Sequence, residues 1–343
     1  MNYKKIFSVL FSVVVFSIML VTLVFMAVFG GSFSENFPLR NSLLSLKTVF
    51  LDITGVEEFD NVYRAEDRLI KVSGPTNQKN TNENTNIILE VSKRTTTPFY
   101  FSLVPTAEYI ERASLNRRAL VWDQGKYIDE IYYNVIESSN IIDITETLLN
   151  CSDDNIYFKT SDRISPRGGY YIFQTVLRKL GNQSPNIQKY DIEYYKNNYQ
   201  AELSKSFIGA NIYDTIAFYR YPLFRREIIM RVTDKNANSI VYKDVYCKDK
   251  NGFDVYMGGE NPITIITNTE TQSEKLLVIS DYTFNVSSGF FVDYFNEITV
   301  INPTVTSNKL KKINMDNYDY VLVLFSTETF NSKSLNSLLN IVE

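Results

Sequence analysis

The chain has 343 residues, of which 44% are hydrophobic and 22% charged, enough apolar side chains for one large or two small globular domains. Its formal net charge of -4 argues against a general nucleic-acid binder, which needs a basic face. The chain contains no histidine and only two cysteines, which excludes a Ser-His-Asp triad, a Cys-His dyad, a zinc site and a His-ligated haem, so we expect no metal and no cofactor.

The N-terminus carries an uncharged apolar run, Ile6 to Phe29, which two lysines precede. As a helix this run would be about 36 Å long, enough to cross a hydrocarbon core of about 30 Å. The positive-inside rule then places residues 1–5 in the cytoplasm, residues 6–30 in the membrane and residues 31–343 outside the cell. A cleaved signal peptide is the alternative, although its apolar region would be shorter and end in a small-x-small site. The sequence therefore predicts a single-pass cell-membrane protein with an extracellular C-terminal domain.

In that location Cys151 and Cys247 would meet an oxidising compartment, where they could form a disulfide. Two unrelated buried thiols are an equal alternative. The sequence does not show whether the two Cα atoms come close enough to pair.

Helical patterns recur after the apolar run. The leucines of Phe37–Phe50 are spaced as on a helix, and Pro38 suits a first helical position. The polar segment Ser73–Asn86 contains Gly and Pro and has no periodicity, so it predicts a surface loop. Ser165 as N-cap, Pro166 as first residue and Gly181 as stop signal predict a helix that runs to Leu180. Two more predicted helices are Lys126–Glu137 and Ser334–Val342.

Apolar, β-rich runs lie between these helices and predict buried strands. They alternate with helical patterns, which favours a three-layer α/β/α fold with a mostly parallel sheet. The region from about 200 to 257 breaks this rhythm with alternating strands and predicts a β-rich insertion. The predicted strands are Ile87–Val91, Phe99–Pro105, Ile141–Ile144, Ile263–Asn268, Leu276–Ser280, Ile298–Asn302 and Tyr320–Ser326.

An ordered set of short segments then suggests a family. The segments include Gly31–Arg40, Val104–Ile110, Ile156–Thr160, Gly168–Tyr171, Tyr256–Gly259, Leu276–Ile279 and Tyr320–Leu324. In this order they resemble DHHW-family proteins, which are bacterial membrane-anchored SGNH-hydrolase-like proteins related to the acetyltransferase subunits of alginate O-acetylation. The resemblance covers nearly all of residues 31–343 and implies an SGNH-like sandwich with a role in cell-envelope polysaccharide O-acylation.

The catalytic residues of that family do not carry over. Its D-H-H-W motif, which supplies the acid and the general-base histidine, is replaced here by Ser161–Ile164. Arg163 stands at the base position, and a guanidinium stays protonated and cannot take a proton. Tyr282 stands at the nucleophile position after the late strand. A serine nucleophile needs a base, so the resemblance implies no catalytic residue, with Ser161, Arg163 and Tyr282 as degenerate positions.

Other residues would line the remnant of the cleft. Asp162, Arg163 and Arg167 could form an anion site at the start of the next helix, or a surface ion pair. Asp281 could act as a lone acid, or cap a helix. A Gly-Gly pair at 258–259 could line a pocket, or form a tight turn. The candidate remnant residues are Asp162, Ser280, Asp281, Thr283, Gly259 and Asn261.

We therefore expect a pseudoenzyme that binds a glycan or a partner in cell-envelope polysaccharide O-acylation, the partner being the polysaccharide or a multi-pass membrane acyltransferase. Tyrosine pairs such as Tyr194-Tyr195 would suit stacking on sugar rings, although core packing is the commoner role. Two alternatives stay open. One is an active acyltransferase or esterase with an unusual centre at Ser280 or Thr283, and the other is a structural assembly subunit, whose old cleft would be filled.

Overall fold

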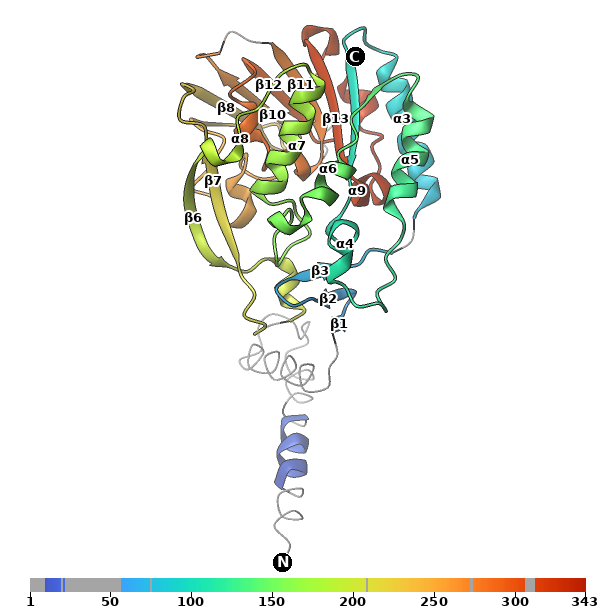
Figure 1. The fold of residues 1–343 in the computed structure, drawn as a ribbon, viewed down its shortest axis with the longest axis vertical. Coiled ribbons are helices and arrows are strands. Elements are labelled where there is room, and N and C mark those ends of the chain that lie inside the picture. The colour runs from blue at the N-terminus through green and yellow to red at the C-terminus, as the bar shows by residue number, and fades with distance from the viewer. Residues whose placement is uncertain are drawn as a thin grey trace, which may run out of the picture. The chain divides into compact units, whose positions relative to one another are not determined.

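One eight-stranded sheet organises the larger part of the chain (Figure 1). Its strands are β4 (Phe99–Val104), β5 (Asn140–Ile141), β8 (Ile228–Thr233), β9 (Ser239–Tyr242), β10 (Ile263–Asn268), β11 (Lys275–Ser280), β12 (Glu297–Ile301) and β13 (Tyr320–Ser326). Their order is β5-β4-β13-β11-β12-β10-β8-β9. The five strands from β5 to β12 are parallel to their neighbours, whereas β10, β8 and β9 pair antiparallel. The expected, largely parallel sheet is thus present, with an antiparallel extension.

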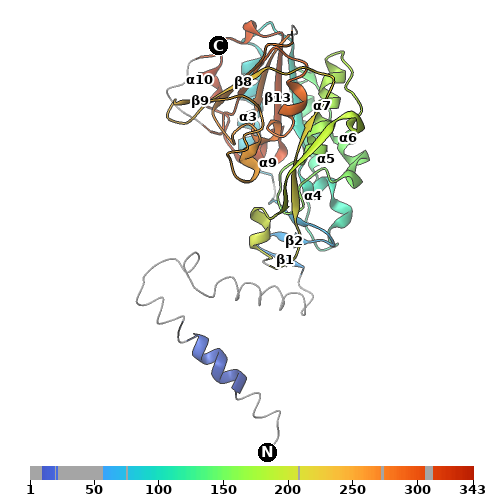
Figure 2. The same ribbon diagram turned by 90° about the vertical axis from the view of Figure 1, so that its left-hand side faces the viewer.

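Helices cover both faces of this sheet (Figure 2). The first face carries α3, α5, α9 and α10, and the second carries α6, α7 and α8. The helices are α3 (Gln78–Ser92), α4 (Ala107–Ile110), α5 (Gln124–Val135), α6 (Thr145–Asn150), α7 (Pro166–Lys179), α8 (Ser288–Phe291), α9 (Thr327–Ser332) and α10 (Leu338–Ile341). This is the predicted three-layer α/β/α arrangement.

The central strand β11 shows why the sequences of the parallel strands are continuous apolar runs. In β11, Leu276 and Val278 point into the core beside α7 and α8, while Leu277 and Ile279 point into the core beneath α3 and α5. All four side chains are fully buried. Because both faces of the strand are covered, neither set of alternating positions can be polar.

Two smaller sheets lie outside the main one. The first consists of β1 (Glu58–Phe59), β2 (Val62–Arg64) and β3 (Leu69–Lys71), and the second of β6 (Asp191–Tyr199) and β7 (Asp214–Arg220). Of the region expected to be an insertion, β8 and β9 extend the main sheet through β10, whereas β7 pairs with β6 as a two-stranded ribbon.

The predicted loop Ser73–Asn86 and strand Ile87–Val91 are wrong from residue 78 onward, because both lie in α3. The side chain of Asn77 accepts a hydrogen bond from the Asn80 amide and begins the helix. The polar residues inside it are partly buried: Asn84 donates to the Phe330 and Lys333 carbonyls and accepts from the Leu335 amide. Hydrogen bonds to distant parts of the chain therefore satisfy the buried polar side chain of Asn84, in a helix that has little apolar periodicity.

The localisation predicted from the N-terminal run is also wrong. The chain divides into two compact units, Met1–Gly55 and Val56–Glu343. The computed structural model describes residues 10–19, 21, 57–74, 76–207, 209–271, 274–305 and 312–343. Within these ranges no helix is long and apolar enough to cross a membrane, which overturns the single-pass cell-membrane assignment with a cytoplasmic N-terminus. The helical stretch described there covers residues 10–19 and 21; the rest of Ile6–Phe29 and the predicted helix Phe37–Phe50 lie outside the described residues.

Candidate functional site

Two segments carry the positions of the expected catalytic residues. The first is a tight hairpin before α7, in which Tyr157 and Ile164 bridge and the Phe158 amide donates to the Arg163 carbonyl. Ser165 then caps α7 by accepting from the amides of residues 167 and 168, as predicted. The second segment follows β11, where a short 3-10 helix spans Tyr282–Phe284. The two segments meet near the carboxyl ends of parallel strands, where α/β folds place their ligands.

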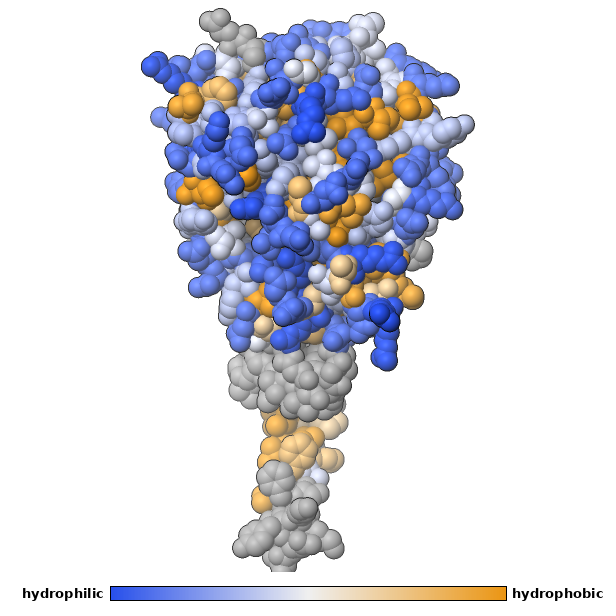
Figure 3. Space-filling view, in the orientation of Figure 1, coloured by the Kyte–Doolittle hydropathy of each residue, from blue (hydrophilic) through white to orange (hydrophobic). Residues whose placement is uncertain are grey.

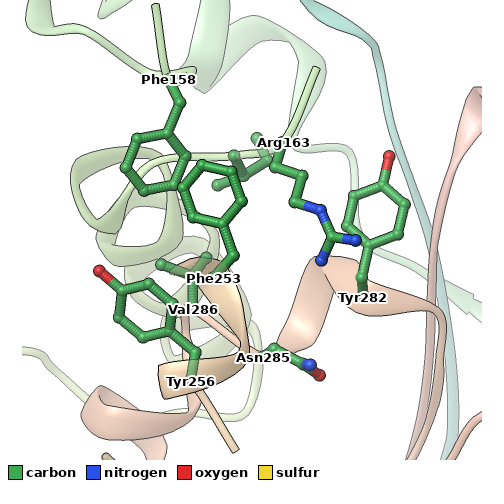
Figure 4. Close-up of a pocket in the computed structure, with 8 residues that line it drawn as sticks. Phe158, Arg163, Phe253, Tyr256, Tyr282, Asn285 and Val286 are labelled. Carbon is green, nitrogen blue, oxygen red and sulfur yellow. The ribbon is translucent and has the colours of Figure 1, made fainter. Parts of the chain in front are cut away.

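Arg163 and Tyr282 contact each other at this place (Figure 4). The guanidinium carbon lies 4.6 Å from the centre of the Tyr282 ring and 5.9 Å from that of Phe253. Arg163 Nη2 lies 2.6 Å from Glu260 Oε1 in an ion pair. The two positions at which the sequence resemblance placed the base and the nucleophile are therefore neighbours in space, and a cation–π contact joins their side chains.

The cleft between these side chains is filled. The remaining cavity has a volume of about 10 Å³ and is lined by Phe158, Arg163, Ile164, Phe253, Tyr256, Tyr282, Asn285 and Val286. A cavity of about 10–15 Å³ holds at most a single water molecule. No acyl group or sugar ring fits at this position without displacement of the arginine or of an aromatic ring.

Neither side chain can take a proton here. Burial opposes the charge of Arg163, but the adjacent Glu260 carboxylate prevails and raises the pKa of the guanidinium above its ordinary value. Burial raises the pKa of the Tyr282 hydroxyl well above its ordinary value, and the nearby Asp162 carboxylate adds to the effect. At neutral pH the first group stays a cation and the second stays a neutral phenol.

Ser280 and Thr283, which flank the position at which the resemblance implied a nucleophile, are both buried. Ser280 is fully buried and its Oγ donates to the Leu324 carbonyl at 2.6 Å, which ties β11 to β13. Thr283 is fully buried as well, and its Oγ1 has no hydrogen-bond partner among the described residues. Neither hydroxyl has a basic group within hydrogen-bond distance, so neither is activated as a nucleophile.

Asp281 acts as a cap. Its Oδ1 accepts from the Thr283 amide at 2.9 Å, and its Oδ2 accepts from the amide and the hydroxyl of Ser326. Ser326 in turn caps α9 by accepting from the Thr329 amide. The carboxylate thus joins the end of β11 to the start of α9, which is the cap alternative considered from the sequence.

Ser161 and Asp162 do not line the remaining cavity. Ser161 is fully buried, its hydroxyl donates to a Glu202 carboxylate oxygen, and it accepts from the Arg163 amide. Asp162 Oδ2 lies 3.5 Å from Lys71 Nζ, and the same ammonium lies 2.7 Å from Glu328 Oε1. These are packing and surface ion-pair roles.

Gly259 and Asn261 belong to a tight turn. Residues 258 and 259 both have positive φ, and a Cβ at Gly259 would approach Asp254 Oδ1 to 2.9 Å. The side-chain amide of Asn261 donates to the backbone carbonyls of residues 258 and 259. The side-chain amide of Asn285 also donates to the carbonyl of residue 259. The side-chain amide of Asn261 is therefore engaged within the turn.

The remaining sequence candidates can now be placed. Cys151 is half-buried and Cys247 buried, and both are free thiols. Burial raises the pKa of Cys247 to about 12, so it is an unreactive thiol. Sequence reasoning missed Glu260 and Phe253 as partners of Arg163. The only local signal for Glu260 is its position directly after the Gly-Gly pair, and no local sequence pattern predicts that Phe253 contacts Arg163.

Comparison with known proteins finds similarity in the overall fold. No protein-family model matches the chain, and no curated protein matches it. A DHHW family protein from Eubacterium siraeum has a similar structure, with a TM-score of 0.67, 16% sequence identity and coverage of 83% of this chain and 97% of the other. Bacillus cereus PatB1 with a sulfonyl adduct follows, with a TM-score of 0.64, 17% identity and coverage of 80% and 97%. The resemblance expected from the sequence is confirmed at the level of the fold, which is similar to that of this DHHW family protein.

Proposed function

We propose that this chain is a non-catalytic SGNH-like protein that takes part in polysaccharide O-acylation by binding a glycan or a partner acyltransferase. The observation that supports this most directly is the contact between Arg163 and Tyr282, which fills the space where the family holds its base and nucleophile. The acylation setting rests on the resemblance to the DHHW family. The active alternative loses support because Ser280 and Thr283 are buried without a base.

A structural assembly subunit is the second candidate, and the filled cleft favours it. With about 10 Å³ of free volume, the cleft itself offers no ligand site. A glycan-binding role then requires a different surface of the molecule. Neither the binding protein nor the assembly subunit would catalyse a reaction. The two candidates differ in whether the protein binds a saccharide.

The proposal is tested by inactivating the gene in the source organism and measuring ester-linked acyl groups on the cell-envelope polysaccharide. Acyl content should fall, and complementation with the wild type and with the Ser280→Ala/Thr283→Ala variant should restore it equally. Unchanged acyl content after inactivation would overturn the role in acylation. A variant that accumulates as a folded protein but fails to restore acylation would overturn the non-catalytic assignment.

A further inference from the structure

The two-stranded ribbon of β6 and β7 has one face in the core. On that face Tyr195 stacks on Phe218 with ring centres 5.1 Å apart, and Phe218 stacks on Tyr246 at 4.4 Å. The alternation of a strand therefore directs the intervening residues to the opposite, outer face of the ribbon.

That outer face carries aromatic and apolar side chains where polar ones are usual. Ile192 pairs with Tyr219 and Tyr194 pairs with Ala217 across the two strands. On β6, Ile192 is 38% exposed and Tyr194 is 66% exposed, whereas their β7 partners Tyr219 and Ala217 are buried. An antiparallel ribbon with one buried face normally presents polar residues on the other. Scattered apolar residues also appear in Figure 3 on the side where β6 and β7 lie.

The outer face forms one wall of a groove. The groove is also lined by the segment before α7 and by the first residues of that helix, including Phe158 and Ser165–Arg167. The groove has a volume of about 390 Å³, within the roughly 300–1,000 Å³ typical of small-ligand sites. Tyr213, which is 43% exposed, and Thr215 also line it. Phe158 lines both the groove and the filled cleft, so the groove lies directly beside the former catalytic position.

The charged groups of the groove already have partners. Lys159 Nζ lies 2.7 Å from an Asp67 carboxylate oxygen, and Arg167 Nη1 lies 3.3 Å from an Asp154 carboxylate oxygen. Asp214 accepts from the Lys159 amide at 2.6 Å and from the Thr160 amide at 2.9 Å. Because these charges are paired, the groove matches a neutral ligand better than an anionic one.

We propose that this groove binds a neutral glycan segment, with saccharide rings lying against Tyr194 and Tyr213. A pyranose ring has an apolar C–H face and a rim of hydroxyls, and a tyrosine offers the matching combination of an apolar ring and a polar tip. The lining groups belong to the face of the ribbon and not to its edge, which disfavours a peptide that would bind by strand addition. The inference rests on the proposed function, since it names the surface on which the glycan is held.

The test is affinity electrophoresis of the purified full chain in native gels that contain hydroxyethylcellulose, glucomannan or glycol chitin, with alginate as the anionic arm. Wild type should be retarded by at least one neutral polymer and not preferentially by alginate. Tyr194→Ala and Tyr213→Ala should each weaken the apparent affinity about threefold to tenfold, as expected for the loss of one aromatic contact. Tyr133→Ala is the matched control, because Tyr133 is 83% exposed on α5 and outside the groove.

Each other result has a defined meaning. Equal retardation of wild type and both groove variants would overturn the groove as the site and leave the acylation role standing. Preferential binding of alginate would overturn the assignment of a neutral ligand. Tryptic casein peptides that abolish the retardation would indicate a peptide partner and overturn the glycan assignment. If no polymer retards wild type, the glycan inference fails, while gene inactivation and complementation still decide the role in acylation.

Discussion

The guanidinium of Arg163 lies over the ring of Tyr282, with 4.6 Å between the guanidinium carbon and the ring centre. These residues occupy the base and nucleophile positions implied by the family resemblance, and they come from segments more than a hundred residues apart in the sequence. Each replacement is suited to the other, because a cation–π contact of this kind contributes about 0.5–2 kcal/mol. In this structure the two side chains form a packing contact.

Removal of the Tyr282 ring should therefore lower stability. Tyr282→Ala removes the nearer of the two rings that Arg163 contacts, leaving the Glu260 carboxylate and the more distant Phe253 ring, and opens a cavity beside Phe253. We expect the free energy of unfolding to fall by about 1–3 kcal/mol, less than for a fully buried ring because Tyr282 is partly exposed. Tyr282→Phe keeps the ring and should retain most of the stability. Urea denaturation measures both, and equal midpoints for Tyr282→Ala and wild type would contradict the packing role.

Asn84 should be essential to α3. Its amide makes hydrogen bonds to the backbone of residues 330, 333 and 335, and the side chain is 1% exposed. Asn84→Ala leaves these buried groups unpaired, which costs about 1–3 kcal/mol for each group that water cannot reach. Asn86→Ala, at an exposed position of the same helix, is the control and should be close to neutral. If the two variants unfold at the same urea concentration, the long-range hydrogen bonds do not stabilise the helix.

The contrast between β11 and α3 explains how far the sequence predicts the fold. The sequence predicts β13 with correct bounds because both of its faces are buried and the apolar run marks it locally. The signals for α7 were also local, since Ser165 and Pro166 begin it and Gly181 follows its end with a positive φ. The residues that stabilise α3 lie about 250 positions away, so its own sequence reads as a loop.

For the candidate site, too, the sequence predicts some features, whereas others depend on contacts between distant parts of the chain. The family resemblance implied positions 163 and 282, but residue types alone did not show that Arg163 and Tyr282 would contact each other. Glu260 and Phe253 reach the arginine from loops whose course depends on the whole fold. The sequence also does not predict that Ile192 and Tyr194 are exposed on the ribbon, because the alternation of a strand does not tell which of its faces meets the core.

The buried carboxyl of Glu108 should make stability depend on pH. Burial raises the pKa of Glu108 above its ordinary 4.5, although hydrogen bonds from Ser73 and Trp122 oppose the shift. The folded state therefore holds this proton more tightly than the unfolded state. Its contribution is fully present below the unfolded pKa of about 4.5 and is lost as the pH rises through the higher folded pKa.

Glu108→Gln cannot ionise and should flatten this part of the stability profile. Urea midpoints measured from about pH 4.5 to pH 8 should decline more steeply for wild type than for the variant. Glu130→Gln on α5 controls for the loss of one exposed carboxylate and should follow wild type. Parallel profiles for wild type and Glu108→Gln would show that this carboxyl is not responsible for the dependence.

The proposed non-catalytic role is tested most directly by hydrolysis of 4-nitrophenyl acetate and butyrate with wild type, Ser280→Ala, Thr283→Ala and Asp281→Asn under identical conditions. A general base contributes about 10²–10⁴ in rate, and among the described residues none is bonded to the hydroxyl of Ser280 or Thr283. We therefore expect all four proteins to hydrolyse these esters at the same rate within error, at or near the buffer blank. A trace rate common to all four is compatible with binding effects alone. A drop of about tenfold or more in one variant that remains folded, roughly 1.4 kcal/mol in the transition state, would contradict the non-catalytic assignment and identify a rebuilt active centre.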